Sequence, residues 1–256
     1  MYFMPAVAFI GGLLLGSFAN VCIWRIPRES SVVTPSSFCP KCLTPIKWYH
    51  NVPVLSYIFL NGKCASCARP ISLRYPLIEM VTGLLTAGWF IRFETVSTAL
   101  VFTLFGLGLI IISGVDMDYR VIPPQVSYPL MVAGLGLAFF NGFISEGPRI
   151  IYAAAGLVTG GLTVFVLRVV GKAAFKKEAI GLGDMKLMMA IGAFTGPAGI
   201  FWTLFIGSFL GSLVGIGMQI SGEVKRGTYI PFGPFLAAGA ALYVLFSEFF
   251  KSLFLI

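Results

Sequence analysis

Residues 97–115, STALVFTLFGLGLIIISGV, form an apolar run without a single charged side chain, and Asp116 follows directly. A helix needs about 20 such residues to cross the hydrocarbon core of a bilayer. The whole chain has this character, since 57% of its 256 residues are hydrophobic and only 11% are charged. A soluble domain usually has about 25% charged residues. The sequence therefore predicts an all-α polytopic membrane protein.

Other apolar runs of similar length predict further spans. We expect about eight transmembrane helices, near residues 4–24, 77–91, 97–115, 125–143, 150–167, 186–202, 203–220 and 231–250. The boundary between the sixth and seventh is the least defined, because Gly196 and Pro197 interrupt the apolar pattern. The first span has no basic region before it, so we interpret it as a retained helix rather than a secretory signal.

The positive charges indicate how these spans are oriented. If the spans alternate, one side of the membrane has only Arg92, Arg149 and Lys251 of the 18 Lys and Arg residues, and the other side has the remaining 15. The positive-inside rule makes the basic side cytoplasmic, which places both termini outside. The net charge of +8 is thus a topology signal, strengthened by anionic lipid. We expect no nucleic-acid partner.

Residues 25–76 form the one polar stretch long enough to be a small folded unit. They contain seven prolines, which exclude long helices and favour loops and short strands. A segment this small cannot bury enough apolar surface to fold unaided. The predicted organisation is a first transmembrane helix (1–24), a cytoplasmic domain (25–76) and a multi-helix membrane domain (77–256).

Two Cys-x-x-Cys motifs supply the cross-link that residues 25–76 need. The four cysteines are Cys39, Cys42, Cys64 and Cys67. Two such motifs at this spacing can close a tetrahedron around Zn²⁺, and four sulfur ligands leave no open position for water, so the zinc would be structural. Two disulfides or a redox pair are the alternatives, and a reducing cytoplasm disfavours the disulfides. The fifth cysteine, Cys22, falls in an apolar span and is expected to be a small buried residue.

Carboxylates are the best candidates for chemistry, because the only histidine, His50, lies in the cysteine-containing loop. Asp116 ends the third span, and Asp184 opens the sixth within Gly181-Leu182-Gly183-Asp184. On the predicted topology both stand at the cytoplasmic boundary of the membrane. Two adjacent carboxyl groups share a proton, so one can activate water while the other polarises a carbonyl. An aspartate at a helix end is also commonly a cap, and the residues alone leave both readings open.

Five further residues are expected to support this pair. Gly181 and Gly183 would let a substrate backbone pass closely, because they lack a Cβ. Lys186 could pair with a carboxylate or with the membrane surface. Asp118 could cap the helix or orient Arg120, and Glu79 near the start of the second span could be a buried hydrogen-bonding partner.

These motifs together resemble the type IV prepilin leader peptidases, bacterial membrane aspartyl proteases with a Gly-x-Gly-Asp motif. The similarity covers nearly the whole chain: residues 16–21 and 25–27, both Cys-x-x-Cys motifs, residues 51–57, 72–76, 116–123, 181–186 and 231–235. It assigns catalysis to Asp116 and Asp184. The family often has an aspartate after the Ile-Pro of the first catalytic segment, where this chain has Pro124 and Gln125.

The resemblance implies an activity and a location. Such enzymes lie in the bacterial inner membrane and cut prepilins and the pseudopilins of secretion systems after a glycine, on the cytoplasmic side. Members with the cysteine-containing loop commonly also methylate the new N-terminal amine, using S-adenosylmethionine. This chain has no glycine-rich nucleotide motif, so its S-adenosylmethionine site is not located by the sequence. Neither the oligomeric state nor the particular pilin follows from the sequence.

Three other functions fit parts of the pattern. A peptidase without methyltransferase activity would keep the aspartates and lack the cofactor. An ion- or proton-coupled transporter would place its acids at mid-membrane in broken helices rather than at a boundary. A zinc-loop scaffold would recruit partners and carry out no chemistry.

Overall fold

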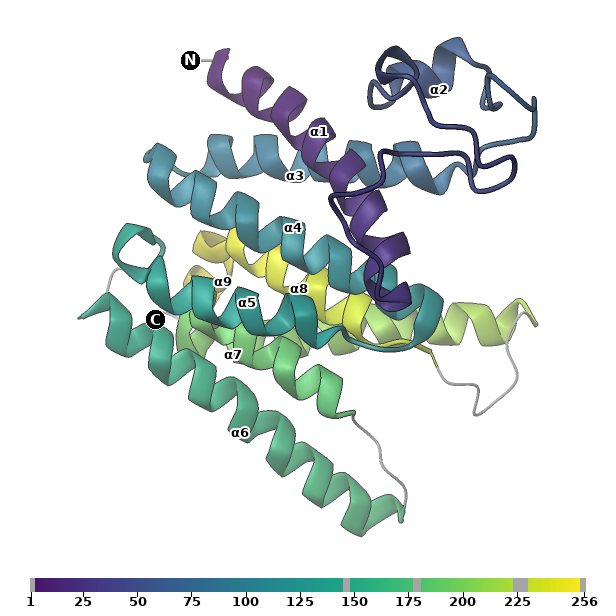
Figure 1. Cartoon of the computed structure of the whole chain (residues 1–256). Coiled ribbons are helices and arrows are strands. Elements are labelled where there is room, and N and C mark those ends of the chain that lie inside the picture. Colours follow the sequence, from purple (N-terminus) through teal and green to yellow (C-terminus); the bar gives the residue numbers. More distant parts are fainter. Residues whose placement is uncertain (1–2, 145–147, 177–180, 223–229, 254–256) are drawn as a thin grey trace. The chain divides into compact units, whose positions relative to one another are not determined.

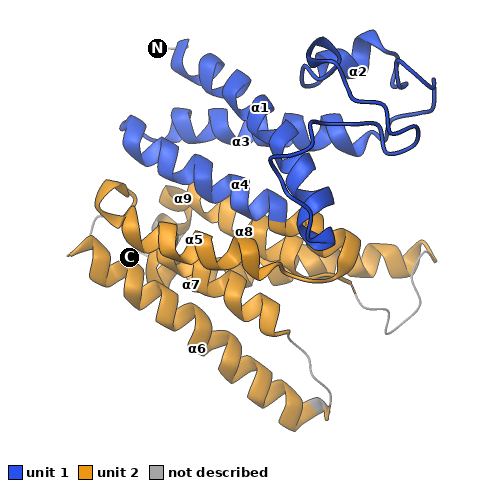
Figure 2. Ribbon diagram, in the orientation of Figure 1, with its two compact units in different colours: residues 1–111 blue, residues 112–256 orange. Residues whose placement is uncertain are grey.

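The computed structural model describes residues 3–144, 148–176, 181–222 and 230–253, and the regular structure in these ranges is helical. The chain divides into two compact units, Met1–Ile111 and Ile112–Ile256 (Figure 2). The helix α4, Val96–Tyr119, begins in unit 1, and its last turns belong to unit 2.

Unit 1 is built on the packing of two apolar helices. α1 (Phe3–Arg25) lies along α3 (Arg74–Arg92) (Figure 1). Glycines on α1 bring the two backbones together: a Cβ at Gly16 would lie 2.6 Å from the Cα of Glu79. Small residues four apart are the usual means of close helix packing in membranes, and Gly12 and Gly16 have this spacing.

Residues 25–76 connect α1 to α3 mainly by loops, as the prolines predict. The ordered pieces are the 3₁₀ turns Ile26–Arg28 and Trp48–His50 and the short helix α2, Leu55–Phe59. The predicted short strands are reduced to two isolated bridges, Phe38 with Pro45 and Lys63 with Pro70. The buried guanidinium of Arg25 donates to the carbonyls of Ser31 (2.9 Å) and Pro35 (2.8 Å), which ties the loop to the end of α1.

Unit 2 is organised around one long helix. Its elements after α4 are α5 (Pro124–Gly136), the 3₁₀ turn Ala138–Phe140, α6 (Arg149–Phe175), α7 (Leu182–Ile220), α8 (Gly233–Leu245) and α9 (Ser247–Leu253). The helices α5, α6 and α8 all pack against α7 (Figure 1). Gly156 and Gly192 meet at the crossing of α6 with α7, where a Cβ on either glycine would collide with the backbone carbonyl of the other.

The predicted interruption at Gly196 and Pro197 is a kink inside α7. Gly196 has φ 71°, outside the helical region, and Pro197 has no N–H to donate. The side chain of Asn141 donates to the carbonyl of Phe194 at 2.8 Å, which satisfies one backbone acceptor beside the kink. The break therefore lies at residue 196 rather than at the expected boundary between residues 202 and 203.

Four helices in the described part of the chain are long and apolar enough to cross a membrane. They are Phe3–Arg28, Val96–Tyr119, Arg149–Ala174 and Leu182–Ile220, with Gly233–Leu245 as a shorter apolar helix. The chain is thus a helical membrane protein, whereas the count of about eight spans stays a prediction. The expected span at 125–143 is shorter than predicted, because α5 ends at Gly136.

Candidate active site and metal centre

Asp116 is a buried carboxylate near the end of α4. Only 3% of the residue is exposed, and its Oδ2 accepts a hydrogen bond from the backbone N–H of Gly233 at 3.0 Å. Gly233 is the first residue of α8, where backbone N–H groups have no partner within the helix, and its N–H finds that partner in the carboxylate. A Cβ at position 233 would lie 2.6 Å from the same oxygen, so any side chain there would force the carboxyl group to shift.

Asp184 lies in the first turn of α7 and is 7% exposed. Its Oδ2 accepts a hydrogen bond from the N–H of Gly181 at 3.1 Å. This is a capping interaction, favoured by the positive end of the helix dipole. A cap alone does not require burial, however, and capping aspartates usually lie at the solvent-exposed surface. Asp184 therefore caps α7 and is also a candidate functional residue.

The two aspartates belong to unit 2, and their charges interact electrostatically. In each aspartate, Oδ2 accepts the hydrogen bond that is found among the described residues. Repulsion between two carboxylates favours a single shared proton, which is the protonation state that acid–base catalysis by an aspartate pair requires.

The expected supporting residues take different positions. Asp118 is exposed, and Gly181 is exposed at the start of α7. Gly183 packs against the side chain of Ile122, since a Cβ there would lie 3.0 Å from the Cβ of Ile122. Lys186 places its ammonium group 4.9 Å from the ring centroid of Tyr128, a cation–π contact.

Glu79 belongs to unit 1, whereas the aspartates belong to unit 2. It is buried, and its Oε2 accepts a hydrogen bond from the N–H of Val54 at 2.8 Å. The side chain thus connects α3 to the segment that begins α2.

Gly233 is the site residue that the sequence reasoning missed. Residues 231–235 entered the sequence analysis only as one of the segments that carry the family resemblance. The available signal was a glycine between two prolines, Pro231 and Pro234, at the start of an apolar run. Its contact with Asp116 joins residues 117 positions apart, and no local pattern predicts such a pairing.

Gly233→Ala should disturb the site without touching either carboxylate. The added methyl group would press on Oδ2 of Asp116, so the carboxyl group must turn away from the N–H that holds it. We expect leader cleavage to fall by about 10²-fold, the typical cost of misplacing a catalytic group. Gly217→Ala is a matched control, since a Cβ there meets nothing within 4 Å. Equal cleavage by both variants would contradict this placement of Gly233.

The four cysteines of the two Cys-x-x-Cys motifs come together, as predicted. Their sulfur atoms all lie within 4.8 Å of one another. Both motifs form the same turn. The N–H of Cys39 donates to the backbone carbonyl of Thr44, and the N–H of Cys64 donates to the backbone carbonyl of Arg69, each across five residues. All five cysteines of the chain are described, and none is in a disulfide. The disulfide alternative is therefore not what the structure shows.

The chemistry of this cluster suits a metal ion. Hydrogen bonds from the side chain and backbone of Thr44 lower the pKa of Cys42 to about 6, so its thiolate forms readily. Backbone N–H groups of Cys67 and Ser66 lower the pKa of Cys64. Four thiols in this arrangement fit the tetrahedral sulfur set that zinc prefers.

These features define a class of protein: a helical membrane protein with a loop cluster of four cysteines that could hold a metal ion and with two buried aspartates in unit 2. Family models agree with both parts. Residues 10–93 match the bacterial peptidase A24 N-terminal domain, and residues 103–216 match the type IV leader peptidase family. The chain belongs to the type IV leader peptidase family.

Similar proteins are named prepilin leader peptidase/N-methyltransferase. The protein of Aeromonas hydrophila is 32% identical over 97% of this chain and 92% of its own length. That of Neisseria gonorrhoeae is 33% identical over 91% and 87%. That of Myxococcus xanthus is 37% identical over 86% of this chain and 65% of its own length. No solved structure matches the chain.

Proposed function

We propose that this protein is a membrane aspartyl endopeptidase that removes the short basic leader of type IV prepilins and pseudopilins. Cleavage follows a glycine, and the protein then methylates the new N-terminal amine. The observation that supports cleavage best is the pair of buried aspartates in unit 2, each held by a glycine N–H through one oxygen. The names of the relatives supply both activities.

Asp116 and Asp184 divide the work of peptide hydrolysis. The ionised carboxylate takes a proton from water, whose oxygen attacks the scissile carbonyl carbon. The protonated carboxyl group donates to the carbonyl oxygen as the tetrahedral intermediate forms. When the intermediate collapses, the carbon–nitrogen bond breaks and the leaving amine takes up a proton. The two carboxyl groups titrate together, so the ionisation state before the reaction is a property of the pair rather than of either residue.

The position of the pair suits a substrate that is half in the membrane. Both aspartates lie near helix ends, Asp116 in the last turns of α4 and Asp184 in the first turn of α7. The excess of Lys and Arg in the loops on this side supports a cytoplasmic position at the bacterial inner membrane, with both termini outside. A prepilin has its basic leader in the cytoplasm and its apolar helix in the bilayer, so cleavage at the boundary keeps that helix out of water.

Two bound groups complete the proposal. Zinc held by Cys39, Cys42, Cys64 and Cys67 is structural, because four thiolates fill its coordination sphere. The methyl donor is S-adenosylmethionine, which supplies an electrophilic methyl group for an amine.

One incubation separates the two activities. Purified protein is mixed with a synthetic prepilin and with S-adenosylmethionine labelled in its methyl group. The masses of the products are then measured by mass spectrometry. The expected product is the mature chain, heavier by one methyl group at its N-terminus and carrying the label. Correctly cleaved product without label would show a peptidase that lacks methyltransferase activity. An uncleaved prepilin would refute the peptidase assignment itself.

A further inference from the structure

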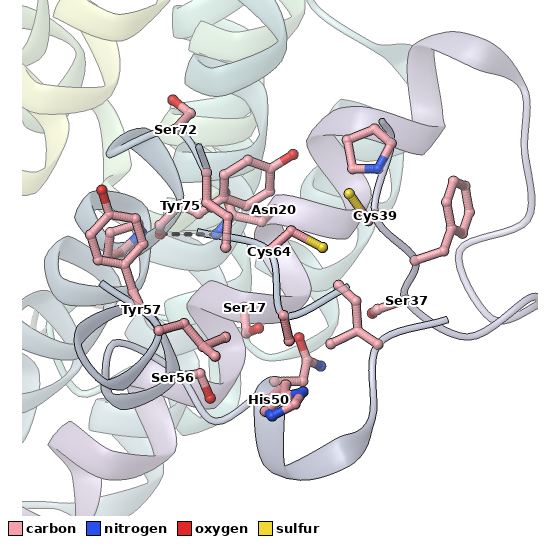
Figure 3. A pocket seen from close by; sticks show the side chains of 18 of the residues that line it. Ser17, Asn20, Ser37, Cys39, His50, Ser56, Tyr57, Cys64, Ser72 and Tyr75 are labelled. Atoms are coloured by element: carbon pink, nitrogen blue, oxygen red, sulfur yellow. Dashed lines mark hydrogen bonds between the residues drawn. The ribbon is translucent and has the colours of Figure 1, made fainter. Parts of the chain in front are cut away.

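The short helix α2 has two different sides. Ser56 and Tyr57 are partly buried and line a pocket of about 550 Å³ in unit 1 (Figure 3). Leu55, Ile58 and Phe59 are exposed, and Phe59 has 80% of its surface accessible. Positions three and four apart share one face of a helix, so these three apolar side chains form a single outward face. Contiguous apolar surface of this kind marks an interaction site.

The 3₁₀ turn Trp48–His50 is attached to α2 and adds to its apolar surface. The Oγ of Ser56 donates to the carbonyl of Tyr49 at 3.1 Å and accepts from the N–H of Val52 at 2.9 Å. Trp48 is 81% exposed, and its ring makes an edge-to-face contact with the exposed ring of Tyr49. Trp and Tyr are enriched where a membrane meets water, because each has an apolar ring and a polar group. We call five exposed residues the loop patch: Trp48, Tyr49, Leu55, Ile58 and Phe59.

Contacts with α3 and α1 fix the level at which the loop patch lies. The N–H of Val54, directly before α2, donates to Oε2 of Glu79 at 2.8 Å. Glu79 packs against Gly16, where a Cβ would lie 2.6 Å from the Glu79 Cα. Gly16 is inside the apolar span Phe3–Arg28, roughly 14 Å of helix before the end of α1 at Arg25. The segment that begins α2 is therefore held at the level of a membrane-spanning helix.

The charge around the loop patch is of one sign. Residues 30–78 contain five basic residues and no Asp or Glu. The basic residues are Lys41, Lys47, Lys63, Arg69 and Arg74. Lys47 directly precedes the patch, and its ammonium group lies 5.8 Å from the ring centroid of Tyr49. Exposed apolar side chains with Lys and Arg beside them are what anionic lipid headgroups attract. A basic prepilin leader would instead be repelled by this charge.

We propose that the loop patch is a membrane-docking surface. Trp48 and the outward face of α2 enter the headgroup region of the bilayer that contains α1, and the neighbouring lysines bind the phosphates of anionic phospholipid. This docking needs only the membrane helices and the loop, so it is independent of the cleavage chemistry of unit 2. It anchors the connecting segment at a third place, besides its junctions with α1 and α3.

Quenching of Trp fluorescence by brominated lipid measures whether Trp48 enters the bilayer. Full-length wild type and Trp48→Phe are placed in nanodiscs, which leave both membrane faces accessible. The lipids are phosphatidylcholine alone, or equal parts phosphatidylcholine and phosphatidylglycerol, with bromine near the headgroup end of the acyl chains. The chain has four Trp residues, so the difference between the two proteins isolates the emission of Trp48.

We expect bromine to reduce the emission of Trp48 by about twofold or more in the anionic discs, and by less in phosphatidylcholine alone. Emission that bromine leaves unchanged in the anionic discs would place Trp48 in water and overturn the proposal. Equal quenching in both lipids would overturn the part assigned to the lysines.

Phe59→Ser tests the outward face of α2 by hydrogen exchange in the anionic discs. The matched control is Val33→Ser, because Val33 is also 80% exposed in the same connecting segment and lies outside the loop patch. Residues 55–60 should exchange about threefold faster in Phe59→Ser than in wild type, because the helix loses its docking contact. Val33→Ser should match wild type. Zinc content shows whether each variant keeps its fold, and equal exchange in all three folded proteins would refute docking of α2.

Two additions separate lipid from the other possible occupants. Discs loaded with one copy of the chain should protect residues 55–60 as well as discs loaded with two copies. Protection that needs two copies would show a contact between chains and overturn the proposal. A synthetic prepilin should leave the quenching of Trp48 unchanged. Loss of that quenching when prepilin is added would identify the patch as a substrate site instead.

Discussion

Asp116→Asn should reduce leader cleavage by about 10²–10⁴-fold, the range expected when a general acid or base is removed. The amide keeps the shape of the carboxylate and can still accept a hydrogen bond from Gly233, so the fold should survive. It cannot exchange a proton with water, however, and it removes the charge that Asp184 experiences. Single-turnover cleavage of a synthetic prepilin, followed by gel or mass spectrometry, measures the effect.

Asp118→Asn is the matched control, because it makes the same change two residues away. Asp118 is exposed, whereas Asp116 is buried. We expect this variant to cleave at nearly the wild-type rate. A large loss for Asp118→Asn, with Asp116→Asn active, would show that the reacting carboxylate of this segment has been misassigned.

Cys64→Ser should remove the metal and unfold residues 25–76. A structural zinc site of four thiolates contributes about 10–16 kcal/mol of apparent binding free energy, and the loop has little else to hold it together. Zinc content by atomic emission should fall to background, and trypsin should cut at the exposed Lys41 and Lys63.

Cys22→Ser provides the control for that substitution. Cys22 is buried in α1 and is not part of the cluster, so this variant should keep its zinc and its resistance to trypsin. Undiminished zinc and equal proteolysis in Cys64→Ser would exclude a structural metal at these four cysteines.

Much of the framework follows from composition and spacing. The apolar run at 97–115 falls within α4, and the predicted span at 77–91 falls within α3. The four cysteines were identified as candidate metal ligands because zinc-binding cysteines recur at characteristic sequence spacings. Their sulfur atoms do lie close together. These features depend on local sequence, which is where pattern reasoning is strongest.

The parts that the sequence did not predict depend on contacts between distant segments. Asp116 meets Gly233 only because α8 begins beside the end of α4, and the Glu79 carboxyl group meets Val54 across 25 residues. The kink in α7 was foreseen from Gly196 and Pro197, but the boundary between the sixth and seventh spans was expected between residues 202 and 203.

The central claim is that Asp116 and Asp184 together cut the leader peptide. Cleavage of a synthetic prepilin by purified wild-type protein and by Asp184→Ala, both in detergent and both checked for zinc content, tests it most directly. We expect the wild type to release the leader after its glycine and the folded variant to release none above background. Leader release by Asp184→Ala at the wild-type rate would contradict it.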